Sequence, residues 1–150
     1  MISNFWKTMR FSIVVFLFFC GCVGPPEPDH GLIENKSVVV NDVSAFSFLM
    51  RNDRHTFEEE YNFNFSNINP NNTLTAGLII SEYAGKDTLF INLYDENDQS
   101  VYNYAINGNY SKIDNYSLRI PHKIIFRGNN FSGIIDYSLI CLLYTSDAAD

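Results

Sequence analysis

The feature that most constrains the fold is a period-two alternation of apolar and polar residues between clusters of turn-forming residues. Residues 57–65 show it best, because aromatic side chains share one face of the segment, namely Phe57, Tyr61, Phe63 and Phe65. The other face collects polar side chains, namely Glu58, Glu60, Asn62 and Asn64. This pattern predicts a strand with one face against a core. No segment keeps a 3.6-residue period, so we expect little helix.

Continued along the chain, the pattern predicts about eight short strands separated by turns. Their expected ranges are 45–50, 57–65, 73–83, 88–94, 101–106, 116–120, 123–126 and 133–140. The segment 73–83 is apolar almost without interruption, which predicts a central position in its sheet. We therefore expect one all-β domain over residues 44–140, an antiparallel β-sandwich with Ig-like or jelly-roll connections. The strand order stays open, as does the loss of a last strand at the C-terminus.

The N-terminus has the layout of an export signal. Lys7 and Arg10 precede an apolar run over residues 11–20, which spans about 15 Å as a helix and is too short to cross a bilayer. The small Gly21 then precedes Cys22. A secretory signal peptide is read from such a layout. Residues 23–43, with three prolines and little apolar periodicity, predict a flexible tether.

Residues 1–22 resemble the signal peptide of bacterial and archaeal membrane lipoproteins, whose lipobox ends in a small residue and then the lipidated cysteine. The resemblance implies that Cys22 carries the lipid, whereas Cys20 follows the bulky Phe19 and leaves with the signal. Two acyl chains suffice for stable anchoring. We therefore expect an extracytoplasmic protein of the cell envelope that is held to the membrane by a lipid on Cys22. An ordinary signal peptide or an uncleaved anchor is the alternative.

The last ten residues, 141–150, resemble the translated sequencing-adaptor tail found on some metagenomic gene predictions. If they are not native, Cys141 is not a native thiol and the natural protein continues past Ile140. No structural disulfide is then expected. The net charge of −7 argues against nucleic acid as a partner and against electrostatic attachment to anionic lipid.

Two groups of residues indicate binding of sugars or attachment of them. Asn-x-Ser/Thr sequons are candidate N-glycosylation sites, and they begin at Asn35, Asn64, Asn71, Asn109, Asn115 and Asn130. Four tyrosines set among asparagines have the composition of a sugar-binding face: Tyr102, Tyr104, Tyr110 and Tyr116. Packing of a core or an edge needs the same rings, and an Asn-rich composition explains the sequons equally well.

An acidic turn is the weak candidate for a metal site. Asp95 and Asp98 alternate with other oxygen ligands, as in a calcium loop, and we considered that Asp87 converges with them. A solvated hairpin turn is the simpler explanation, so no metal and no cofactor are predicted. None of His30, His55 and His122 neighbours a nucleophile elbow, a zinc motif or a phosphate loop, and we therefore do not expect an enzyme.

The sequence thus predicts a lipid-anchored surface protein whose β-sandwich is a binding or structural module with an unknown ligand. Two alternatives stay open. One is a carbohydrate-binding module, assisted by calcium or not. The other is a subunit of an envelope assembly that binds an envelope protein through a sheet edge or through the tether. An enzyme domain beyond residue 140 is a further case that the sequence leaves undecided.

Overall fold

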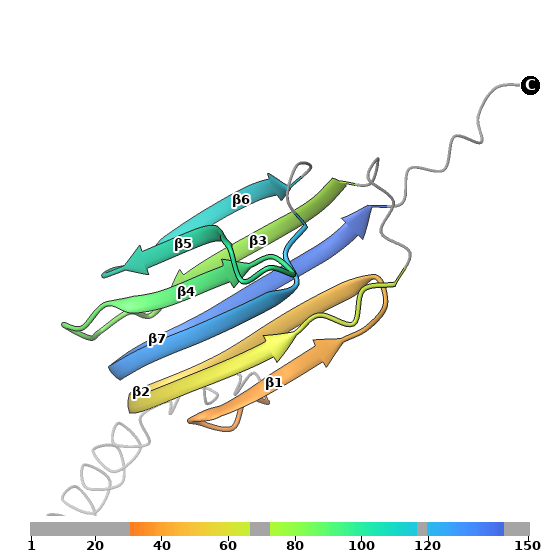
Figure 1. Cartoon of the computed structure of the whole chain (residues 1–150). Coiled ribbons are helices and arrows are strands. Elements are labelled where there is room, and N and C mark those ends of the chain that lie inside the picture. Colours follow the sequence, from red (N-terminus) through yellow and green to blue (C-terminus); the bar gives the residue numbers. More distant parts are fainter. Residues whose placement is uncertain (1–30, 67–72, 117–119, 143–150) are drawn as a thin grey trace, which may run out of the picture. The chain divides into compact units, whose positions relative to one another are not determined.

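The computed structural model describes residues 31–66, 73–116 and 120–142, and the regular structure of these residues consists of strands alone. Within this part of the chain, no helix is long and apolar enough to span a membrane. The described residues form seven strands, which Figure 1 labels: β1 (Lys36–Asn41), β2 (Ala45–Asn62), β3 (Thr73–Ser81), β4 (Leu89–Tyr94), β5 (Ser100–Ile106), β6 (Tyr110–Tyr116) and β7 (Lys123–Leu142).

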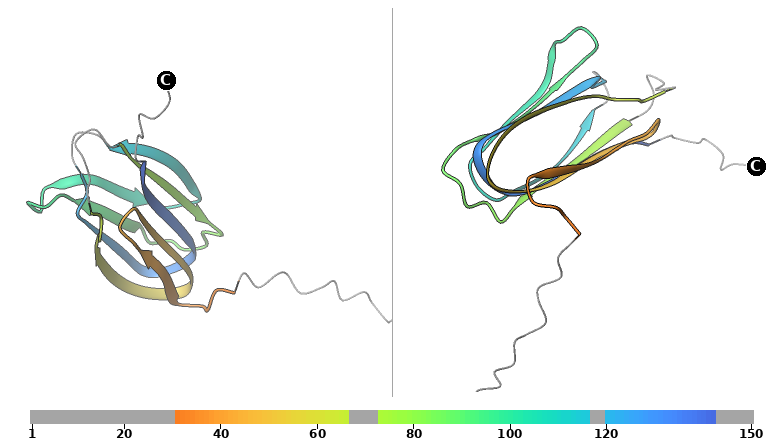
Figure 2. Two further views of the ribbon diagram at one scale, coloured as in Figure 1. Left: turned by 90° about the vertical axis from the view of Figure 1, so that its right-hand side faces the viewer. Right: turned by 90° about the horizontal axis from the view of Figure 1, so that it is seen from below.

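Two long strands, β2 and β7, pair antiparallel along their whole length and run through both layers of a sandwich. The first half of β2 and the second half of β7 lie in what we call sheet one, in the order β1, β2, β7, β3, β6. The other halves lie in sheet two, in the order β2, β7, β4, β5. All pairings are antiparallel. Figure 2 shows the paired strands β2 and β7 bending back on themselves.

Irregular backbone at the bend lets the two long strands turn from one sheet into the other. The register between them shifts on either side of His55, which marks bulges in the ladder. Arg54 and Asn130 have positive φ angles of 47° and 46°, and Gly133 has φ 148°. A Cβ on Gly133 would lie 3.0 Å from the carbonyl oxygen of Ser81, so this position requires glycine.

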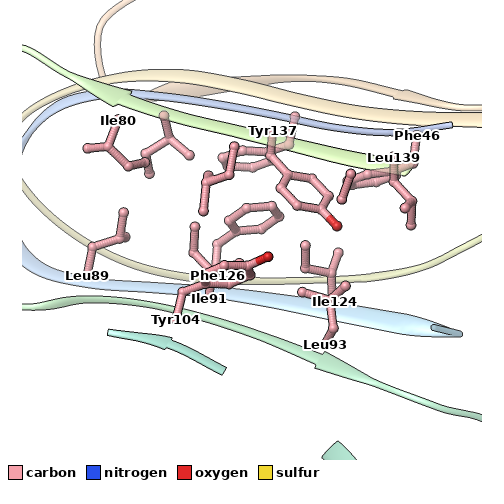
Figure 3. Packing of buried hydrophobic residues seen from close by; sticks show 14 of the residues in the cluster. Phe46, Ile80, Leu89, Ile91, Leu93, Tyr104, Ile124, Phe126, Tyr137 and Leu139 are labelled. Atoms are coloured by element: carbon pink, nitrogen blue, oxygen red, sulfur yellow. The ribbon is translucent and has the colours of Figure 1, made fainter. Parts of the chain in front are cut away.

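The core lies between the sheets and is filled by the inward-facing residues of every strand except the edge strand β1, whose Val39 packs against it half-buried. Phe48 of sheet one stacks on Phe126 of sheet two with ring centroids 3.9 Å apart, and Phe126 contacts the ring of Tyr137 edge-on. Figure 3 shows the rings of Phe126 and Tyr137 meeting between the layers. Each fully buried side chain of this size contributes about 1.5–3 kcal/mol. The burial of these aromatic residues therefore holds the two sheets together.

The predicted all-β antiparallel sandwich is confirmed, whereas the division into short strands is wrong in two places. The segments 45–50 and 57–65 belong to one 18-residue strand, β2, and the segments 123–126 and 133–140 belong to one 20-residue strand, β7. The turn-like residues between these segments form bulges instead of loops, because both strands bulge at the same level. Pairing between β2 and β7 continues on either side of the bulges. The predicted central position of residues 73–83 is confirmed, because β3 lies between β7 and β6.

The strands at both edges of sheet one differ from expectation. β1 lies inside residues 23–43, so the tether prediction is wrong for Lys36–Asn41, where the short run Val38 to Val40 pairs with β2. β6 occupies residues 110–116, whereas the sequence predicted a strand over 116–120. Most residues of β6 are polar, so the alternation of apolar and polar residues did not predict a strand there. Residues 1–22, including Cys22, lie outside the described residues.

Cys141 and Leu142 continue β7 and pair with Leu74 and Thr73 of β3. Cys141 is buried and its thiol is free. Pairing in a ladder depends on backbone geometry and does not reveal the origin of a segment, so the foreign tail stays a prediction. Residues 143–150 lie outside the described part of the chain.

Candidate functional site

The four predicted tyrosines come together at one margin of the sandwich, where β5 of sheet two faces β6 of sheet one. β5 contributes Tyr102 and Tyr104, whose ring centroids are 4.4 Å apart. β6 contributes Tyr110 and Tyr116, whose centroids lie 6.3 Å from Tyr104 and 6.4 Å from Tyr102, respectively. We call these four residues the tyrosine cluster. Tyr104 and Tyr116 are only 4% and 7% exposed, and the other two are half-buried.

A carboxylate and an ammonium group complete the tyrosine cluster. The hydroxyl of Tyr104 donates to Asp114 and lies 3.2 Å from the hydroxyl of Tyr116. Lys112 forms an ion pair with Asp114 at 3.0 Å and donates to the hydroxyl of Tyr102, whose ring centroid is 4.3 Å from Nζ. These contacts connect β5 to β6 across the margin between the two sheets.

The environment raises the pKa values of three members of this network. Burial raises the pKa of Tyr104, and the neighbouring carboxylate of Asp114 raises it further. Burial is also the main reason why the pKa of Tyr116 is raised. Hydrogen bonds to Tyr102 and Asp114 raise the pKa of Lys112, because they favour its charged form. The raised pKa values favour the neutral form of Tyr104 and Tyr116 and the charged form of Lys112.

The asparagines predicted to serve these rings face elsewhere. Asn103 lies between Tyr102 and Tyr104 on β5 and points to the face opposite to their rings. On β6, Asn115 precedes Tyr116 and likewise points away from that ring. Asn109 accepts a hydrogen bond from the backbone N–H of Tyr83 at 3.0 Å. Rings and amides therefore do not form one surface, and two of the four rings pack inward. Sugar binding by the tyrosines stays a prediction, restricted to the half-buried Tyr102 and Tyr110.

The three acidic residues considered for calcium do not converge. Asp87 precedes β4 and Asp95 follows it, which separates them by about 20 Å of extended chain. Asp95 accepts the backbone N–H groups of Asn97 and Gln99, both at 2.9 Å, and so closes its own turn. Asp98 pairs with Lys123 at 2.7 Å, which lowers the pKa of Asp98. In the described ranges no group of three His, Cys, Asp or Glu side chains is placed to hold a metal ion.

The sequons are exposed wherever the structure describes them. Exposed positions are those of Asn35, Asn64, Asn109, Asn115 and Asn130, while Asn71 lies outside the described residues. The Asn64 amide nitrogen donates to the carbonyl of Asn41 at 3.2 Å, so it is the least available acceptor for a glycan. Asn115 accepts from the hydroxyl of Thr75 through its oxygen, which leaves its nitrogen directed away from that contact. Use of the sequons stays a prediction.

Sequence reasoning missed the outer face of sheet one, which carries exposed aliphatic side chains. Ile113 is 74% exposed, and Val38, Val40, Ile79 and Ile140 are also exposed on this face. One sequence signal points to it. The run Leu78-Ile79-Ile80 is apolar on both faces of β3, and only one of those faces meets the core.

Comparison with known proteins gives similarities of fold. No family model matches the chain, and no curated protein matches it. A protein of the Bacillus endospore appendages, which are disulfide-linked pili, matches with TM-score 0.43 and 13% identity over 72% of this chain and 92% of its own. The capsular polysaccharide assembling protein CapF from Staphylococcus aureus matches with TM-score 0.37 and 10% identity over 83% of this chain.

The glycosylation-associated protein complex Gap123 from Streptococcus agalactiae matches with TM-score 0.34 and 14% identity over 76% of this chain. The matches cover 33% of the CapF chain and 44% of the Gap123 chain. At such identities and TM-scores the likeness is confined to the all-β architecture.

Proposed function

We propose that this chain is a lipid-anchored protein of the cell envelope whose β-sandwich is a binding or structural module outside the cytoplasm. The observation that carries the proposal is the order of Lys7 and Arg10, the apolar run 11–20, Gly21 and Cys22. A buried core that begins soon after this segment, at Phe46, supports it, since an anchored module needs a folded domain. Two acyl chains on Cys22 would be enough for stable attachment, whereas a single chain binds a membrane only weakly.

The test replaces each N-terminal cysteine separately in a cell that processes lipoproteins. Cys22→Ala is expected to abolish incorporation of a labelled fatty acid and to leave the unprocessed, larger precursor. Cys20→Ala is the matched control, two residues away in the same apolar context, and is expected to keep both lipid and processing. Label that persists in Cys22→Ala, or that disappears in Cys20→Ala instead, would contradict the proposal.

A second candidate function is that of a subunit in an envelope assembly, and the aliphatic outer face of sheet one favours it. Contiguous apolar surface on a folded domain marks an interaction site more often than chance exposure does. Detergent extraction of intact membranes, followed by native sizing of the complex that contains this chain, tests the idea. A chain that migrates as a solitary monomer under the mildest extraction would refute it.

A further inference from the structure

The two outer faces of the sandwich differ mainly in their exposed aliphatic side chains, and sheet one also carries an ion pair between Arg51 and Glu82 at 2.9 Å. On sheet two, Arg127 pairs with Glu58 at 2.7 Å, and Lys123 pairs with Asp98 at 2.7 Å, beside the exposed Phe90. On sheet one, each of the five strands contributes at least one aliphatic side chain to the outer face: Val38, Val40, Leu49, Ile134, Ile140, Ile79 and Ile113. Sheet one therefore exposes more large aliphatic side chains than sheet two does.

The strand register arranges the outer face of sheet one as a ridge beside a trough. Leu49, Asp136 and Ile79 stand side by side on β2, β7 and β3, and we call this row the ridge. The next outward row on the same three strands, the trough, consists of small residues: Ser47, Ser138 and Gly77. The two rows have equal length and are about 7 Å apart, the spacing of alternate residues in a strand.

The ridge and the trough are complementary to each other, and a two-fold axis between the two rows brings them together. Such an axis lies across the strands and stacks each strand on its own copy in the reverse direction. It places Leu49 over Ser47 of the second copy, Ile79 over Gly77, and Asp136 over Ser138. From this geometry we infer that the outer face of sheet one binds a second copy of this chain. Each contact then occurs twice, as an isologous interface requires.

The rows beyond the ridge and the trough fit the same axis. Ile134, one row outside the ridge, comes to face Ile140, one row outside the trough. On the edge strand Val38 faces Val40, and on β6 the small Ser111 faces the large Ile113. Large side chains therefore meet either small ones or other aliphatic ones. Aligned sheets cross at about 30°, so β2, β7 and β3, which lie nearest the centre, hold most of the interface.

Area and charge set the strength of this contact. Five strands at 4.8 Å and about 24 Å of strand length give a face of roughly 550 Å², or about 1,100 Å² for two copies. This is near the minimum of about 1,000 Å² for a specific interface, so we expect a dissociation constant of about 10–100 µM. Asp136 is the one charge in the ridge, and the hydroxyl of Ser138 is the group that it would meet. Desolvation of two carboxylates opposes association.

The experiment measures self-association of the full chain by sedimentation velocity in detergent, with micelles in excess, from about 1 to 200 µM protein. The wild type is expected to pass from monomer to dimer over this range. Ser47→Leu fills the trough opposite Leu49, so it is expected to weaken association at least about tenfold. Ser47→Leu combined with Leu49→Ser exchanges the two rows on β2 and is expected to restore it.

This set of variants separates a fitted interface from general stickiness, because an added exposed leucine would strengthen non-specific association. Asp136→Asn is expected to tighten the dimer at least about fivefold by removing two buried charges. Phe90→Lys, an exposed aromatic residue on the outer face of sheet two, is the matched control and is expected to change nothing. Circular dichroism checks that each variant is folded.

A wild-type chain that stays monomeric throughout the concentration range would overturn the inference and leave the face to another partner. Tighter association of Ser47→Leu, or equal loss in Phe90→Lys, would also overturn it. The lipid on Cys22 is not needed for any of these outcomes, so failure of the anchor proposal and failure of this one are distinguishable.

Discussion

Two buried tyrosines with opposite hydrogen bonding provide the sharpest test of how this core is stabilised. Tyr104 is 4% exposed, and its hydroxyl donates to Asp114. Tyr137 is fully buried at the centre of the core, and its hydroxyl has no partner among the described residues. Figure 3 shows both side chains in the same cluster. Removing one oxygen from each, as Tyr104→Phe and Tyr137→Phe, therefore changes almost the same buried volume with opposite consequences.

The expected magnitudes follow from the partners. A hydrogen bond to a charged group contributes about 1.5–3 kcal/mol, so Tyr104→Phe is expected to lower the free energy of unfolding by about 2 kcal/mol. An unsatisfied buried hydroxyl costs about 1 kcal/mol or more, so Tyr137→Phe is expected to be neutral or to stabilise by about 1 kcal/mol. The two variants should differ by about 3 kcal/mol, or at least about 10 °C in melting temperature.

Urea denaturation followed by circular dichroism measures both values, provided that the slope against urea is the same for the three proteins. A double-mutant cycle with Asp114→Asn assigns the effect, because the loss in Tyr104→Phe should shrink by at least about 1 kcal/mol when the carboxylate is absent. If the two Tyr→Phe variants were destabilised equally, the hydrogen bond between Tyr104 and Asp114 would contribute nothing and the reasoning would be refuted.

Three further predictions rest on single features of the fold. Asn52 is 4% exposed and neither its amide nitrogen nor its amide oxygen has a partner within the described ranges, so Asn52→Leu is expected to raise the free energy of unfolding by about 1–3 kcal/mol in the same urea assay. Gly133→Ala is expected to lower it by at least about 2 kcal/mol, because φ is 148° and the new Cβ would lie 3.0 Å from the Ser81 carbonyl oxygen; an unchanged midpoint would contradict this. Burial raises the pKa of three tyrosines above their unfolded value, so their stabilising effect is complete below about pH 10 and is lost as pH rises further, at roughly 1.4 kcal/mol per pH unit for each. Absorbance of tyrosinate that rises before unfolding, instead of together with it, would contradict the burial of Tyr104, Tyr116 and Tyr137.

The sequence predicted the strands well where apolar and polar residues alternate over a long stretch, as in 57–65 and 88–94. It placed a turn over Arg51–Thr56, between the strands predicted over 45–50 and 57–65. In the structure β2 runs through this segment, since β7 bulges opposite it and supplies the ladder on both sides. A bulge depends on two distant segments at once, and a local pattern contains only one of them.

The candidate site, too, was predicted from the sequence only in part. The tyrosines were found from their spacing and composition, and they do gather at one margin. That two of the rings face inward, and that Asp114 and Lys112 join them, depended on how β5 and β6 close the sandwich. The acidic residues looked adjacent because they are close in the chain, whereas β4 separates Asp87 from Asp95.

The amino-acid sequence by itself determined the class of fold, because side chains that alternate in a strand require two layers to bury one face of each. It also contains the linear segment ending at Cys22 on which we base the proposed export signal and lipid anchor. The tertiary structure alone decided which outer face stays apolar. Strand register sets the neighbours of each outward residue. A shift of one strand by a single residue would turn its side chains to the other face, so Leu49, Asp136 and Ile79 would no longer lie side by side. Register is fixed by packing between distant strands, and for that reason no local pattern reveals it.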